Sequence, residues 1–143
     1  NDMSLLFRHI DDAVSLFESC RGGRCGSMLY SIKAIADAER GRQESAEKSI
    51  ERAEIFLKDV SRKQWLATQY LAKAWLLSKS SKNKKTQQKN SRSPWGSTEE
   101  LALRSAALYE ECGFIDRAKW IRKKFNAGIG KNSSLLYSRH KVA

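Results

Sequence analysis

Proline and histidine are scarce in this sequence of 143 residues, and long apolar runs are missing from it. With one proline and few β-branched stretches, it has neither the helix breakers nor the strand formers of a β-rich protein. No apolar run approaches the roughly 20 residues that cross a bilayer, so we expect no membrane span. The composition predicts an all-α protein that forms a single helical domain over residues 1–143.

The scarcity of catalytic and ligand side chains argues against an enzyme. His9 and His140 are the only histidines, and no Ser-His-Asp set, His-Glu-x-x-His motif or glycine-rich nucleotide motif is present. Cys20, Cys25 and Cys112 are an odd number of cysteines, which is typical of reduced intracellular thiols rather than of a disulfide framework. As a set they do not have a recognisable zinc spacing. We expect no enzymatic activity, no cofactor, no metal, and a cytoplasmic or nuclear location.

Acidic residues are scarce in the second half of the chain. Residues 1–75 carry 12 Lys and Arg against 11 Asp and Glu, whereas residues 76–143 carry 15 against 5. Of the net charge of +11, +10 therefore lies in the second half. This asymmetry is typical of a protein with a polyanionic partner, which leaves nucleic acid, an acidic protein and an anionic membrane surface open. A surface that is basic only for solubility is the remaining alternative.

Apolar residues recur at helical spacing through most of the chain, which predicts about six helices. The expected spans are 2–20, 27–40, 44–58, 61–78, 97–112 and 114–125. Buried stripes are expected at Leu6, Ile10, Ala13, Phe17 and Cys20 in the first span, and at Met28, Ile32 and Ile35 in the second.

The last two spans carry the strongest local signals. Ser97 followed by Glu100 is a capping box, which predicts that a helix begins there. Gly113 predicts the end of that helix, because glycine takes the left-handed conformation of a C-terminal cap without a Cβ clash. Two helices joined at one glycine are expected to fold back as an antiparallel hairpin.

A shift of 72 residues superposes this hairpin on an earlier one. The small residues that match are Ala34, Gly41 and Ala46 in the first hairpin, and Ala106, Gly113 and Ala118 in the second. This spacing resembles the tetratricopeptide repeat, although Asp37 takes an aromatic position of that family and Arg122 an apolar one. The resemblance implies an array of antiparallel helical hairpins that serves as a protein-interaction scaffold, and it implies no enzymatic activity.

Between the fourth and fifth spans lies a basic stretch with nothing apolar to bury. Residues 79–96 are expected to form a disordered loop, and a flexible tail is expected at 127–143. Within the loop, residues 79–93 form a basic arm that predicts contacts to phosphates or to an acidic surface. Its basic residues are Lys79, Lys82, Lys84, Lys85, Lys89 and Arg92.

The last span adds a second candidate surface. Its cations are Arg117, Lys119, Arg122, Lys123 and Lys124, more than are needed to complement a helix dipole. Trp120 lies among them, as in surfaces where an aromatic ring stacks on a base. In the apolar span 61–78, Trp65 and Trp75 are either core residues or interface anchors, since tryptophan is enriched where binding energy concentrates.

Two functional hypotheses remain. In the first, the chain is a non-enzymatic adaptor whose concave helical face takes an acidic protein or peptide. In the second, it is a nucleic-acid-binding protein that contacts phosphates through the arm and the last hairpin. The repeat resemblance favours the first hypothesis. The sequence does not predict an oligomeric state.

Overall fold

The computed structural model describes residues 2–20, 25–57, 62–83 and 93–127, and all regular structure in these ranges is helical. The helices are α1 (Asp2–Ser19), α2 (Gly26–Glu39), α3 (Gln43–Leu57), α4 (Lys63–Asn83), α5 (Thr98–Glu111) and α6 (Ile115–Lys124). The predicted all-α class is confirmed, and each of the six predicted spans contains a helix in the described residues, although the fourth helix ends later than predicted. Among these helices, none combines the length and the apolar character that crossing a membrane requires.

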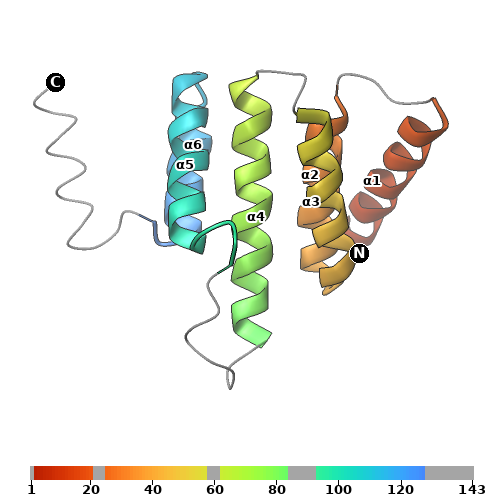
Figure 1. The fold of residues 1–143 in the computed structure, drawn as a ribbon, viewed down its shortest axis with the longest axis horizontal. Coiled ribbons are helices and arrows are strands. Elements are labelled where there is room, and N and C mark those ends of the chain that lie inside the picture. The colour runs from red at the N-terminus through yellow and green to blue at the C-terminus, as the bar shows by residue number, and fades with distance from the viewer. Residues whose placement is uncertain (1, 21–24, 58–61, 84–92, 128–143) are drawn as a thin grey trace, which may run out of the picture.

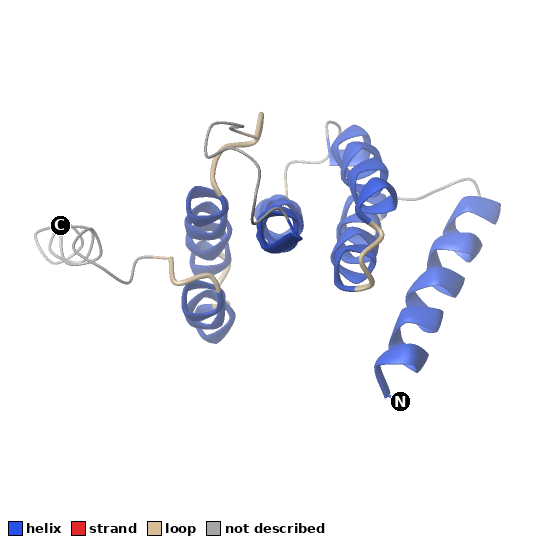
Figure 2. Ribbon diagram, turned by 90° about the horizontal axis from the view of Figure 1, so that it is seen from below, coloured by secondary structure: helices blue, strands red, loops and turns tan. Residues whose placement is uncertain are grey.

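The helices form a flat array in which α4 stands between two antiparallel pairs (Figure 1). The pair α2–α3 packs on one side of α4 and the pair α5–α6 lies on the other, while α1 packs outside α2 (Figure 2). In Figure 1, α3 and α5 lie nearer the viewer than α2 and α6. Because α4 is the single helix between the two pairs, side chains on its opposite sides contact both of them.

Alanines let these helices approach closely. Ala34, Ala46, Ala106 and Ala118, the small residues of the predicted repeat, are all fully buried. The core on the first side of α4 consists of Ala34, Ala38, Ala46, Ile50, Ala72 and Leu76. The core on the second side consists of Ala67, Leu71, Ala74, Leu101, Ala102, Ala106, Tyr109, Ala118, Ile121 and Ala127. Small residues at the contacts and a few large ones between them are typical of closely packed helices.

Glycine turns end α2 and α5 in the same way. Gly41 has a φ of 75° and Gly113 a φ of 88°, both in the left-handed region. After α5, the Gly113 amide donates to the Glu110 carbonyl at 2.9 Å and the Phe114 amide to the Tyr109 carbonyl at 2.8 Å. This is a Schellman motif, which satisfies the last carbonyls of the helix. At the other end of α5, Ser97 forms the predicted capping box in full.

The expected apolar stripes are wrong in part. In α1, Leu6 is 49 % exposed and Cys20 is also exposed, whereas Val14, outside the expected stripe, is buried. In α2, Ile32 is 37 % exposed, while Tyr30 is buried on another side of the helix. The apolar arc of α1 is wider than its contact with α2, so spacing alone did not show which part is covered.

The predicted loop 79–96 begins later than expected, because α4 continues through Asn83. Lys79 Nζ pairs with Glu39 Oε1 at 3.1 Å, and Ser80 Oγ donates to the Leu76 carbonyl at 3.0 Å. These contacts stabilise a turn of helix that has no apolar residue of its own. Residues 84–92 and 128–143 lie outside the described residues, so the disorder predicted for the arm and the tail stays a prediction.

Candidate binding site

Trp75, near the middle of α4, lies at the centre of an aromatic group that joins α4 to α6. Its ring centroid is 6.0 Å from that of Trp120 and 6.1 Å from that of Phe125. The second pair meets edge to face, the arrangement that the charge distribution of aromatic rings favours. Trp75 and Phe125 are half-buried, whereas Trp120 is 48 % exposed. This group therefore presents a large aromatic surface to solvent.

Lys124 lies over these rings. Its Nζ is 4.2 Å from the centroid of Trp75, 5.6 Å from that of Trp120 and 5.9 Å from that of Phe125. An ammonium group within about 6 Å of a ring face is attracted by the negative charge of that face. We call Trp75, Trp120, Lys124 and Phe125 the aromatic–lysine cluster. It places a positive charge in the middle of the exposed aromatic surface.

Glu39 of α2 borders the cluster on the other side of α4. Its Oε1 accepts a 2.5 Å hydrogen bond from Trp75 Nε1 and pairs with Lys79 Nζ. Burial by itself raises the pKa of the Glu39 carboxyl, but Trp75 and Lys79, together with the charge of Lys124, outweigh it and lower the pKa below its ordinary value. Glu39 therefore stays ionised near neutral pH and holds the Trp75 indole in one orientation.

Several cationic side chains of α6, in the cluster and beside it, have no carboxylate partner among the described residues. Within the part of the chain that the structure describes, no carboxylate forms an ion pair with Arg117, Lys119, Lys123 or Lys124. Arg122 differs, because it is bonded to Glu110 of α5. Four cations on a helix of ten residues attract an anionic ligand.

The other residues predicted for binding differ in whether they are buried, exposed or outside the described residues. Trp65 is only 8 % exposed, beneath the Arg62 guanidinium at 4.9 Å, so it belongs to the core and not to an exposed surface. Lys82 lies in the last turn of α4, but its side chain is outside the described part. Lys84, Lys85, Lys89 and Arg92 also lie outside the described residues. Among the predicted residues whose side chains the structure describes, Lys79, Trp75 and the α6 residues lie together at the junction of α2, α4 and α6.

A buried ion network, which the sequence analysis did not predict, joins α1, α2 and α3. Asp37 is fully buried and accepts bonds from Lys33 at 2.6 Å, Arg40 at 2.6 Å and Ser45 at 2.7 Å. Arg40 also donates to both carboxylate oxygens of Asp11, at 2.9 and 3.1 Å. The sequence signal was an acidic residue at a position where the repeat family has an aromatic one. Since every charge in the network is satisfied, it stabilises the packing and offers no group to a ligand.

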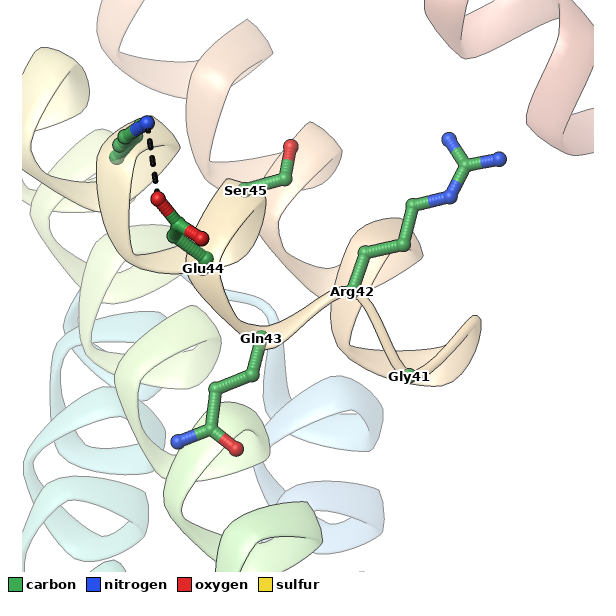
Figure 3. A pocket seen from close by; sticks show the side chains of 6 residues that line it. Gly41, Arg42, Gln43, Glu44 and Ser45 are labelled. Atoms are coloured by element: carbon green, nitrogen blue, oxygen red, sulfur yellow. Dashed lines mark ion pairs between the residues drawn. The ribbon is translucent and has the colours of Figure 1, made fainter.

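An open depression of about 660 Å³ lies beside this network, at the turn between α2 and α3. Its lining comprises Gly41, Arg42, Gln43, Glu44, Ser45 and Lys48 (Figure 3). Glu44 and Lys48 pair with each other at 3.2 Å, and both side chains are largely exposed. No aromatic side chain lines this depression, whereas the aromatic–lysine cluster has three aromatic rings. In the described residues, no group of three or more His, Cys, Asp and Glu is placed to hold a metal ion.

Comparisons with protein-family models, with curated proteins and with solved structures found no match for this chain. Over the residues that the structure describes, the fold is a packed array of six α-helices that is compatible with a helical-repeat arrangement. The aromatic–lysine cluster combines the 48 % exposed ring of Trp120 with the ammonium group of Lys124 at one place on that array.

Proposed function

We propose that this chain is a non-enzymatic binding module for an acidic protein or peptide. The partner docks on the aromatic–lysine cluster, where α2, α4 and α6 meet. The observation that carries the proposal is the position of Lys124 over Trp75 beside the 48 % exposed ring of Trp120. Such a surface offers apolar contact and positive charge at one place.

The energetics of interfaces support this choice. Tryptophan is enriched among the few interface residues that carry most of the binding energy. Trp75 is already oriented by Glu39 and by its ring contacts, so little side-chain entropy remains to be lost when a partner binds. The unpaired cations Lys119 and Lys123 add attraction for a carboxylate-rich partner, which raises the association rate and the specificity.

The resemblance to the tetratricopeptide repeat adds support to the same proposal. The alanines expected at the close contacts, such as Ala34 and Ala106, are fully buried, and both turn glycines are left-handed. In addition, the bond between Thr68 and Tyr109 at 2.6 Å joins α4 to α5, so that α4 links the pairs α2–α3 and α5–α6 in one array. In the repeat family, such pairs form a surface for peptides.

A nucleic-acid partner is the second candidate, and the exposure of Trp120 among cations favours it. An exposed aromatic ring next to Lys119 and Lys123 can stack on an unpaired base while the ammonium groups contact the backbone. The two candidates use the same surface but differ in the ligand, so one experiment separates them.

The test compares two labelled probes by fluorescence anisotropy: a peptide of alternating Glu and Leu, and a single-stranded oligonucleotide of similar length. The variants are Trp120→Ala and Lys124→Gln. The control is Lys48→Gln, which removes one exposed cation from α3, far along the array from α6. We expect Trp120→Ala to weaken peptide binding by about tenfold or more, the effect of losing an interface anchor. Lys124→Gln weakens it too, and the control leaves it unchanged.

Tighter binding of the oligonucleotide than of the peptide decides for nucleic acid. In that case log affinity falls with log salt with a slope of about −0.7 for each phosphate contact. If neither probe binds, or if Lys48→Gln weakens binding as much as Lys124→Gln, the aromatic–lysine cluster is not a binding site. Circular dichroism of each variant checks that the helices are retained.

A further inference from the structure

The side of α1 that faces away from α2, at one end of the array, exposes large apolar side chains. Leu5, His9, Asp12 and Leu16 recur at i, i+4, i+7 and i+11, so they share one side of the helix. All four are exposed, Leu5 by 55 % and Leu16 by 66 %, and Leu6, next to Leu5 in the sequence, by 49 %. Leu5 and Leu6 lie near the start of this side and Leu16 near its end, with the polar residues His9 and Asp12 between them.

The opposite end of the array also exposes apolar surface, but with a different charge. On α6, Ile115, Lys119 and Lys123 lie four residues apart on one side and are exposed, Ile115 by 46 %. Phe114, at the start of the same helix, is 37 % exposed. Figure 1 shows α1 and the α5–α6 pair at the two ends, with the other helices between them.

The two ends carry opposite net charge. Helix α1 contains four carboxylates and one arginine, whereas α6 contains one carboxylate and five cations. Like charges oppose the pairing of α1 with α1 and of α6 with α6 in a symmetric dimer. Opposite charges favour a contact between α1 of one copy and α6 of another.

We propose that the α1 end of one molecule docks on the α6 end of a second copy of the same chain. In arrays of helical pairs each unit contacts only its neighbours, and terminal faces are normally polar. Here both terminal faces have exposed large apolar side chains, Leu16 and Ile115 among them. Because the contact joins two different surfaces, it leaves a free end on each molecule and generates open chains. This assembly is independent of the aromatic–lysine cluster, and its test uses no peptide or nucleic acid.

The experiment is sedimentation velocity of the full chain over a wide concentration range, at low salt and at about 0.5 M salt, where charges are strongly screened. We expect wild type to form larger species as its concentration rises, and to form fewer of them at high salt. Leu16→Lys removes an apolar contact and adds a positive charge at the α1 end. Lys119→Glu replaces a cation with a carboxylate at the α6 end. Both side chains are exposed, so we expect each variant to fold and to remain monomeric by itself.

Mixing these two variants is the decisive step. The Leu16→Lys chain keeps a native α6 end and the Lys119→Glu chain keeps a native α1 end, so the mixture forms dimers and nothing longer. Ile55→Lys is the matched control, since Ile55 is 63 % exposed on α3, outside both ends. We expect it to assemble as wild type does.

The proposal is overturned if wild type is a monomer at every concentration, or if the mixed variants stay monomeric. It is equally overturned if Ile55→Lys prevents assembly as strongly as Leu16→Lys, or if both end variants assemble like wild type. Because Leu16→Lys and Ile55→Lys leave α6 and Trp75 unchanged, peptide binding of these two chains can be measured separately from assembly, and failure of one proposal leaves the other intact.

Discussion

Replacing Asp37 with alanine removes the centre of the ion network that joins the first three helices. The Asp37 side chain is fully buried, while those of its partners Lys33 and Arg40 are 20 % and 14 % exposed. The substitution leaves Lys33 without its carboxylate partner, Arg40 without one of its two carboxylate partners, and Ser45 Oγ without its acceptor. The loss is therefore larger than the net contribution of the ion pairs, since uncompensated charge remains near the core.

The magnitude follows from burial. Removing one partner of a fully buried ion pair costs about 3–5 kcal/mol. Lys33 reaches solvent in part and Arg40 keeps both of its bonds to Asp11, so the cost here lies at or below the lower end of that range. We expect Asp37→Ala to lower the free energy of unfolding by about 2–3 kcal/mol.

Urea denaturation followed by circular dichroism measures this loss. Glu44→Ala is the matched control, because Glu44 also forms an i,i+4 ion pair on the first hairpin, with Lys48, but both of these side chains are largely exposed. Such a pair contributes about 0–1 kcal/mol, so we expect the control to lie close to wild type. If Asp37→Ala and Glu44→Ala shift the midpoint equally, burial of the network does not stabilise the fold and the reasoning is wrong.

Two further predictions concern a turn and a titration. Gly113→Val should lower the free energy of unfolding by about 1–2 kcal/mol, because φ at this position is 88° and an L-residue is strained there even though a Cβ would meet open space. An unchanged urea midpoint would contradict it, and Gly113→Asn, which tolerates this conformation better, should cost less. The second concerns Asp11, whose pKa is lowered from the ordinary 3.8, first by its hydrogen bond from Arg40. Its contribution to stability is thus present above that ordinary value and is lost as the pH falls through the lower pKa of the folded state. Wild type should lose more stability on acidification than Asp11→Asn, and parallel curves for the two chains would refute the assignment.

The local features of this fold could be read from the sequence. The capping box at Ser97 and the turns at Gly41 and Gly113 depend on residues within a few positions of each other, and the structure has all of them. The ends of α2 and α5 agree to within one residue for the same reason, since capping and backbone conformation are local properties, whereas α4 continues beyond its predicted end. The buried alanines Ala34 and Ala106 were also predicted, because only small residues permit a close approach of two helices in a hairpin.

The tertiary structure decided which apolar side chains are covered and which residues meet. Trp65 and Trp75 lie ten residues apart on one apolar helix, yet the first is buried and the second contacts Trp120 and Lys124 at the surface. Their difference depends on where α2, α5 and α6 pack around α4, and spacing within α4 carries no information on that. In the same way, the apolar arc of α1 is wider than its contact, and only its place at the end of the array leaves Leu16 exposed. Periodicity gives the faces of a helix, but the neighbours that bury a face come from distant parts of the chain.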